Sequence, residues 1–152
     1  MTAPFVPEDF EPPARLVTRD FVLEPLGSQH NERDHVAWTS SMAHINATPG
    51  FAGTEPEDPW PRPMTLSENL QDLEGHAADF AARRGFTYSV LDPADEDVIG
   101  CVYLYPSKDE HDVRVQSWVR VSRAELDVVL WRVVSDWLAT DWPFTNPGYD
   151  AR

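Results

Sequence analysis

SWVRVSRAELDVVLWRVVSDWL, residues 117 to 138, joins a strand pattern directly to a helix pattern and decides the fold of this chain. Its second half repeats apolar side chains at steps of three and four, which is the spacing of one helix face. These side chains are Leu126, Val129, Leu130, Val133, Val134, Trp137 and Leu138. Its first half belongs to DVRVQSWVRV (112 to 121), where valines alternate with polar or aromatic residues, as on a strand with one buried face. The sequence therefore predicts a strand that runs into an amphipathic helix packed on the sheet.

Three further strands are predicted before this one. FTYSVL (86 to 91) and VIGCVYLY (98 to 105) are separated from each other and from the last strand by the short polar linkers DPADED and PSKDEH. Such linkers predict antiparallel hairpins. RDFVLEPL (19 to 26) predicts an earlier strand, and Pro25 favours a place for it at the sheet edge.

Two further helices are predicted between the first and second strands, over residues 28 to 45 and 65 to 85. Apolar side chains on one side of the earlier helix are Val36, Trp38, Met42 and Ile45. The later helix begins with Thr65 and Glu68 at the spacing of a capping box. It is predicted to end at Gly85, because glycine is a common helix stop.

Three segments lack a periodic pattern. Residues 1 to 14 hold four prolines and three acidic residues, which predicts an extended arm. Residues 47 to 64 are dense in proline and glycine and predict a loop, either a substrate-facing lid or an ordinary surface loop. The tail predicts at most one short strand, and Pro147 and Gly148 argue against its being regular. Residues 15 to 152 are predicted to form a single α+β domain, with a mostly antiparallel sheet and helices on both faces.

Charge and composition exclude several classes of protein. The 26 acidic and 12 basic side chains give a formal charge of −14, which repels nucleic acid and anionic lipid. No apolar run reaches the roughly 20 residues of a membrane helix, and there is no secretory signal, so a cytoplasmic protein is predicted. Cys101 is the single cysteine and lies in an apolar strand, which favours a core residue. The five histidines show no ligand spacing, so no metal is predicted.

The junction between the last strand and its helix allows two interpretations. A strand that ends at a helix N-terminus offers unpaired amides and the positive end of the helix dipole to a phosphate. Ser122 and Glu125, however, fit the S-x-x-E capping box, in which each side chain accepts from the backbone amide of the other. A cap of this kind would occupy donors that a phosphate needs. The residues favour the cap over the phosphate site.

The order of these segments resembles the GCN5-related N-acetyltransferase (GNAT) superfamily. The resemblance rests on RLVTRDFVLEPL as the opening strand, on the hairpin FTYSVLDPADEDVIGCVYLYP, and on VQSWVRV leading into AELDVVLWRVVSDWL. It covers about residues 15 to 145. It implies a short and divergent GNAT-like fold with truncated C-terminal elements. It also implies transfer of an acetyl group from acetyl-CoA to a small-molecule amine, a protein N-terminus or a lysine.

The same resemblance implies where a cofactor would lie. In the family, the strand before the main helix bonds the pantetheine arm through its backbone, and a Q/R-x-x-G-x-G/A loop surrounds the pyrophosphate. The matching positions here are Val119, Arg120, Val121, Ser122, Arg123, Ala124 and Glu125. The family glycines are absent and the segment is shorter. Arg120 and Arg123 could compensate by pairing with the phosphates.

An acceptor is expected on the polar face of the last strand. The residues expected to meet it are Gln116 and Trp118 on this strand and Tyr103 and Tyr105 on the neighbouring strand. The alternative is that Arg114 and Arg120 pair with acidic residues while Trp118 packs beneath a helix. Where many family members carry a catalytic glutamate, this strand offers Arg114 and Gln116, and nothing in the spacing gives Tyr149 a role. The catalytic residues therefore stay unassigned.

Two functions follow from the sequence. One is an acetyl-CoA-dependent N-acetyltransferase. The other is a non-catalytic relative with a degenerate cofactor loop, which binds a small ligand or a protein partner. A sheet that ends near residue 145 would also expose a strand edge, and such an edge could be covered by a homodimer.

Overall fold

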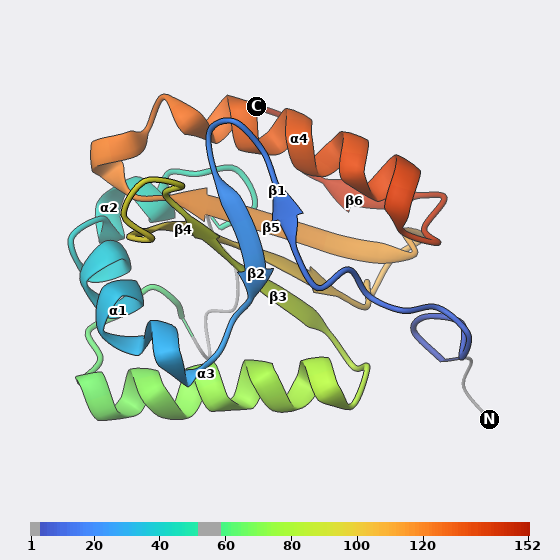
Figure 1. Ribbon diagram of the computed structural model, residues 1–152, viewed down its shortest axis with the longest axis horizontal. Helices are drawn as coiled ribbons and strands as arrows, with labels where there is room; N and C mark the ends of the chain where they lie inside the picture. Colours follow the sequence, from blue (N-terminus) through green and yellow to red (C-terminus); the bar gives the residue numbers. More distant parts are fainter. Residues whose placement is uncertain (1–3, 52–58) are drawn as a thin grey trace.

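Six strands form one sheet in the computed structural model, which describes residues 4–51 and 59–152. They are β1 (Leu16–Val17), β2 (Val22–Pro25), β3 (Phe86–Leu91), β4 (Val98–Tyr105), β5 (Val113–Val119) and β6 (Pro147–Tyr149). Each strand pairs with the next in the chain, and every pair is antiparallel except β5 with β6 (Figure 1). The predicted hairpins that join β3, β4 and β5 are confirmed.

Helices cover both faces of this sheet. They are α1 (Asn31–Thr39), α2 (Met42–Asn46), α3 (Leu66–Ala81) and α4 (Leu126–Asp141), with 3-10 turns at Ser28–His30 and Val121–Arg123. In Figure 1, α4 lies along one side of the sheet, and α3 lies along the opposite side. The α+β fold predicted from the sequence is therefore confirmed.

The face under α4 carries the larger apolar core. The buried side chains of α4 are Leu126, Leu130, Val134, Trp137 and Leu138. They belong to one cluster with Val113, Val115 and Val119, which project from β5 at alternate positions. The predicted amphipathic stripe is confirmed, with Val129 and Val133 only partly buried at its flank.

The opposite face carries a second core. Trp118 is fully buried there and clusters with Cys101, Trp38 and Leu73. Cys101 stands directly opposite Trp118 in the β4–β5 register. Burial raises the pKa of the Cys101 thiol, which keeps it protonated. The prediction that this cysteine is a core residue is confirmed.

Two predictions for the first third of the chain are wrong. β2 is not the sheet edge, because β1 pairs with it in the register Leu16↔Leu23. The single helix predicted over 28 to 45 is a 3-10 turn followed by α1 and α2. The amide of Ser41 closes a tight turn between the two helices on the carbonyl of Trp38. Val36, expected on the apolar side, is 56% exposed.

The start of α3 is confirmed, but its end is not. Thr65 Oγ1 accepts from the Glu68 amide at 3.1 Å, and Glu68 Oε1 accepts from the Thr65 amide at 2.9 Å. The helix ends earlier than predicted, because the residue in the left-handed conformation is Arg83, with φ of 63°. Gly85 has another role, since a Cβ there would lie 2.2 Å from the ring of Tyr105.

The tail forms β6, a short strand as the sequence allowed, and it includes Pro147 and Gly148. An edge strand tolerates proline, and β6 lies at the edge of the described sheet. Asp112 fixes the approach of this strand to β5. Its carboxylate accepts from the amides of Thr145 at 2.7 Å and Asn146 at 3.1 Å. Pairing of β6 with a second copy of the chain stays a prediction.

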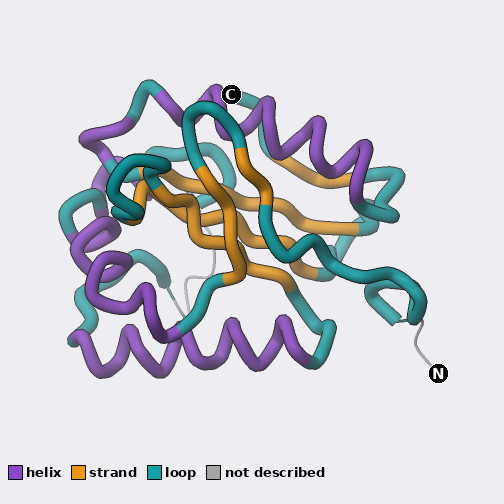
Figure 2. The backbone as a smooth tube through the Cα atoms, in the orientation of Figure 1, coloured by secondary structure: helices purple, strands orange, loops and turns teal. Residues whose placement is uncertain are grey.

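The N-terminal arm packs onto the domain. Figure 2 shows the chain from residue 4 to residue 15 as loop, without helix or strand. Val6 is only 1% exposed and belongs to the core under α4. Phe5 stacks on Phe86 with ring centroids 5.8 Å apart. The arm thus closes one end of that core.

The described parts of the predicted loop, residues 47–51 and 59–64, contain neither a strand nor an α-helix. Residues 52–58 of that loop lie outside the described residues. Among the described helices, not one combines the length and the apolar character that crossing a bilayer requires.

The close approach of β4 and β5 at Gly100 gives a test of the packing. A Cβ there would lie 2.0 Å from the backbone oxygen of Trp118. We expect Gly100→Ala to lower the free energy of unfolding by about 1–3 kcal/mol through overpacking. Gly75→Ala is the control, because it lies on α3 with nothing within 4 Å and should stabilise by about 1 kcal/mol. Urea unfolding measures both changes, and a neutral Gly100→Ala would contradict this packing.

Candidate functional site

A cavity of about 660 Å³ opens on the sheet face opposite α4. Its walls come from β4, β5, α3 and the segments around Phe51 and Trp60. Aromatic and polar lining residues include Phe51, Trp60, Asp72, His76, Tyr103, Tyr105, Lys108, Arg114 and Gln116. This volume and this mixture of apolar walls with a few polar groups are typical of a small-molecule site.

Three of the four predicted acceptor residues line this cavity. The β4–β5 register places Tyr103 opposite Gln116 and Tyr105 opposite Arg114, so all four side chains share one face. Burial raises the pKa of both tyrosines, and both therefore keep their protons at neutral pH. The prediction that these tyrosines lie beside the polar face of β5 is confirmed.

Trp118 lies behind the cavity wall. Its indole Nε1 donates to Tyr103 Oη at 2.9 Å, and its ring centroid lies 6.1 Å from that of Trp60. Trp60 in turn contacts Tyr103, with a centroid distance of 6.5 Å. Trp118 therefore supports two aromatic walls of the cavity from beneath. This arrangement matches the alternative in which Trp118 packs within the core.

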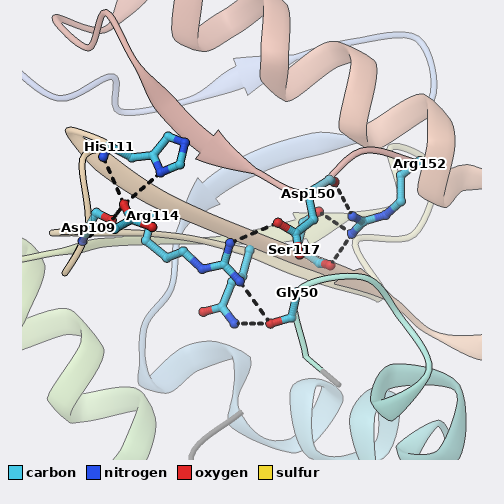
Figure 3. A network of polar contacts seen from close by, with 9 residues as sticks. Gly50, Asp109, His111, Arg114, Ser117, Asp150 and Arg152 are labelled. Carbon is cyan, nitrogen blue, oxygen red and sulfur yellow. Dashed lines mark hydrogen bonds and ion pairs between the residues drawn. The ribbon is translucent and has the colours of Figure 1, made fainter. Parts of the chain in front are cut away.

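Arg114 and Gln116 both donate to the backbone carbonyl of Gly50, and Figure 3 shows the contact of Arg114. Gln116 Nε2 donates to the Gly50 carbonyl at 2.8 Å, and Arg114 also pairs with Asp150 at 3.2 Å. Gly50 has φ of +98°, a conformation that disfavours other residues. The amide of Gln116 is therefore fixed at the cavity wall.

His76 is a cavity residue that the sequence did not single out. Its Nδ1 lies 2.8 Å from Tyr105 Oη and 3.1 Å from Thr87 Oγ1. Its Nε2 lies 3.8 Å from Asp72. Burial lowers the pKa of His76, although the carboxylates of Asp72 and Asp79 oppose this shift. The only sequence signal was its i, i+4 and i, i+3 spacing from these two aspartates on one helix.

The capping box predicted at Ser122 and Glu125 does not form. Val121–Arg123 makes a 3-10 turn, and α4 begins after it with no side-chain cap hydrogen bond. Ser122 lies inside that turn and cannot serve as the extended cap residue. The amide of Val121, expected to meet the pantetheine arm, donates to Ser41 Oγ at 2.9 Å.

The two arginines expected at the phosphates contact the β3–β4 turn. Arg123 Nη1 lies 2.8 Å from Asp92, and Arg120 Nη1 lies 3.1 Å from Asp97. The hydrogen bond from Arg123 lowers the pKa of Asp92. The alternative in which Arg114 and Arg120 pair with acidic residues is confirmed. A phosphate at this junction would bind beside these pairs or displace them.

β5 and β6 pair briefly and then part. Their last pair is Val115↔Tyr149, whereas β5 continues to Val119. The backbone groups of Ser117 and Val119 face the side of β6, because alternate strand residues point to the same neighbour. Within the described part of the chain, this edge of β5 therefore has no strand partner beyond Val115. This edge leads to the N-terminus of α4.

Two hydroxyl groups meet where the strands part. Tyr149 Oη and Ser117 Oγ share a short hydrogen bond. Burial raises the pKa of Tyr149 to about 12, so its hydroxyl keeps its proton at neutral pH. The sequence had given Tyr149 no role.

Arg152 occupies part of the free β5 edge. Its Nη2 donates to the Ser117 carbonyl at 2.8 Å, as Figure 3 shows. Its Nε lies 2.6 Å from Asp127 on α4, and the Arg152 side chain is only 3% exposed. The described lining of the cavity contains none of the seven predicted cofactor residues 119 to 125.

One group of possible metal ligands lies among residues 4–51 and 59–152. Asp109, Glu110 and His111 follow β4 and are largely exposed. Asp109 already accepts from Ser107 and from His111, and these hydrogen bonds hold the pKa of Asp109 well below its usual range. The Asp109 carboxylate thus stabilises the turn through hydrogen bonds within it, and Figure 3 shows the contact with His111.

A buried polar network joins α1 to α3 behind the cavity. Asn69 Nδ2 donates to Asp34 Oδ2 at 3.0 Å and to Asn31 Oδ1 at 2.9 Å. Trp38 Nε1 donates to Asn69 Oδ1 at 3.0 Å. Asp34 is only 4% exposed, and burial raises its pKa from an ordinary 3.8 to about 6. The network fixes α3 against α1, and α3 supplies Asp72 and His76 to the cavity wall.

The fold resembles that of several solved acetyltransferases. A ribosomal-protein alanine acetyltransferase from Vibrio fischeri matches with a TM-score of 0.62 and 15% identity, over 83% of this chain and 67% of the other. A GCN5-related N-acetyltransferase from Brucella melitensis matches with a TM-score of 0.62 and 16% identity, over 86% of this chain and 57% of the other.

A third match was solved with coenzyme A. It is an alpha-N-protein acetyltransferase of ribosomal protein, with a TM-score of 0.61 and 11% identity, over 83% of this chain and 68% of the other. No family model matches the sequence, and a search of curated proteins gave no match. At these identities the likeness establishes the fold.

The raised pKa of Asp34 predicts how stability depends on pH. The folded protein binds this proton more tightly than the unfolded chain, so the contribution of Asp34 to the free energy of unfolding falls as pH rises from about 4 to about 6. In Asp34→Asn, this pH-dependent change of about 2–3 kcal/mol in the free energy of unfolding should be absent. Urea unfolding of both proteins at pH 4.5 and 7.5 measures the difference between them. A difference that does not change with pH would contradict the assignment.

Proposed function

Since the chain has the fold of the GNAT superfamily, we propose that it transfers an acetyl group from acetyl-CoA to an amine. One observation carries the proposal: β5 parts from β6 after the pair Val115↔Tyr149, and its free edge leads to the N-terminus of α4. A pantetheine arm could add to Ser117 and Val119 as an extra strand would. The pyrophosphate would then reach the helix N-terminus, where amides and the dipole favour an anion.

The acceptor amine would bind in the cavity on the other side of β5. Gln116 lies in its wall and directly precedes Ser117, so a ligand there approaches the same strand as the pantetheine arm. The aromatic faces of Trp60 and Tyr103 and the carboxylate of Asp72 suit an ammonium group. Two structural neighbours act on ribosomal proteins, which supports a protein N-terminus as the acceptor.

The reaction needs a proton donor for the departing thiolate. As the amine attacks the thioester carbonyl, a C–N bond forms and the C–S bond breaks, and the sulfur leaves with the electron pair. Tyr149 is protonated at neutral pH and bonds Ser117 at the point where the strands part. We assign it as the general acid. The cofactor supplies the activated acetyl group, and the chain aligns the two reactants.

Calorimetry with acetyl-CoA tests this function directly. Binding at 100 times the dissociation constant should stabilise the fold by about 2.7 kcal/mol, with adenosine diphosphate as the control for unspecific phosphate binding. Mass spectrometry of amines and peptides incubated with acetyl-CoA should then show an added acetyl group. No binding at millimolar acetyl-CoA would overturn the enzyme function.

A second candidate function is a non-catalytic relative that binds a ligand or partner. The observation that favours it is the occupied cofactor edge. Arg152 bonds the Ser117 carbonyl, and Val121 donates its amide to Ser41. Internal partners therefore use groups that acetyl-CoA would need. The cavity could still bind a planar or charged small molecule in this case.

Replacement of Arg152 separates the two candidates. We expect Arg152→Ala to bind acetyl-CoA about tenfold more tightly, because the hydrogen bond to Ser117 no longer has to be displaced. The free variant should also unfold more easily, since Asp127 loses its ion pair. Arg132→Ala is the matched control, because Arg132 is an exposed arginine on α4. Calorimetry reports the affinities.

Equal or weaker binding by Arg152→Ala than by the unchanged chain would show that Arg152 does not compete with the cofactor. If neither protein binds millimolar acetyl-CoA, the non-catalytic function is favoured.

A further inference from the structure

His76 lines the cavity and contacts the sheet through its Nδ1. Its side chain is 21% exposed and lines the cavity beside Tyr103, with ring centroids 5.6 Å apart. Its Nδ1 contacts Tyr105 and Thr87 on the neighbouring strands. Its Nε2 has Asp72 at 3.8 Å, beyond hydrogen-bond distance.

The hydrogen bonds around Tyr105 fix the tautomer of His76. A carboxylate only accepts, so Tyr105 must donate its proton to Asp79 at 2.9 Å. Tyr105 Oη can then only accept at its 2.8 Å contact with His76 Nδ1, which places the ring proton on Nδ1. Thr87 Oγ1 at 3.1 Å is a second acceptor for the same N–H. Nε2 consequently carries the lone pair.

The surroundings of His76 suit a base that gains and then loses a proton. Burial lowers its pKa, so the ring is neutral near pH 7. Once protonated at Nε2, the ring would face the Asp72 carboxylate, while Asp79 would act through Tyr105. Among residues 4–51 and 59–152, the other charged groups that line the cavity are Arg62, Lys108, Asp109 and Arg114.

We propose that His76 is the general base that takes the proton from the acceptor amine, with Tyr105 and Asp79 as positioning residues. The inference rests on the acetyl transfer proposed above. An acceptor that binds as an ammonium group first loses one proton to solvent. As the C–N bond forms, the neutral amine nitrogen loses a second proton to His76 Nε2, and the departing thiolate gains one proton from Tyr149. His76 then releases its proton to solvent, and Tyr149 takes one up from solvent. One amine and one acetyl-CoA therefore yield one amide and one thiol.

Enzyme kinetics test the role of His76 as a base. His76→Gln should lower kcat about 10²- to 10⁴-fold, with unchanged affinity for acetyl-CoA. In the unchanged chain, kcat/KM should fall as pH drops below the pKa of His76. This fall at low pH should be absent in His76→Gln. Added imidazole should partly restore the rate of His76→Ala. His44→Gln, the same change on α2, is the control and should keep the full rate.

A spectroscopic test does not depend on activity. Nitrogen NMR of the full chain at neutral pH should show His76 protonated at Nδ1 and bare at Nε2, and Tyr105→Phe should shift the ring toward the other tautomer. Tyr105→Phe should also lower kcat about tenfold and move the pH limb. Thermal melting of each variant establishes that it is folded.

Each outcome decides between the proposals. If the unchanged chain transfers acetyl groups and His76→Gln does so equally well, His76 is not the base and the proposed function stands. A proton on Nε2 in the NMR spectrum also overturns the role of His76 alone. A chain that neither binds acetyl-CoA nor acetylates any amine overturns both.

Discussion

The packing of α4 on β5 is the contact on which the rest of the structure depends. Leu130 and Val134 of α4 are fully buried in one cluster with Val113 and Val115 of β5. Strand residues alternate between faces, so the side chains between these valines must point away from α4. Arg114, Gln116 and Trp118 therefore face the other side. One apolar contact thus produces both the core and the polar wall of the cavity.

Besides its two faces, β5 also has a partly unpaired edge. Beyond Val115 the strand no longer pairs with β6, and the carbonyl of Ser117 receives the guanidinium of Arg152 instead. Buried backbone groups need hydrogen-bond partners, so a side chain can bond to a strand edge where no neighbouring strand does. The same need makes this edge suitable for an extended ligand arm. The two candidate functions differ in whether Arg152 can be displaced from it.

Two capping boxes with the same sequence signal have different outcomes. Thr65 is extended, with ψ of 162°, and in this conformation its side chain and that of Glu68 each accept from the backbone amide of the other. Ser122 has the same spacing from Glu125 but lies in a 3-10 turn. That turn is tied to the β3–β4 hairpin by the ion pair of Arg123 with Asp92, across 31 residues of chain. A distant contact therefore overrides the local motif.

The sequence by itself determined the strands β3 to β5, the amphipathic α4, their order, and the face on which Tyr103 and Gln116 lie. These features follow from periodicity, which neighbouring residues encode locally. Only the tertiary structure decided the strand pairing at Pro147, the contact of Arg152 with Ser117, and the contact of His76 with Tyr105. Such contacts join residues that are far apart in the chain. Hydrogen bonds depend on distance and direction, and a repeating sequence pattern carries no information on the distance between remote residues.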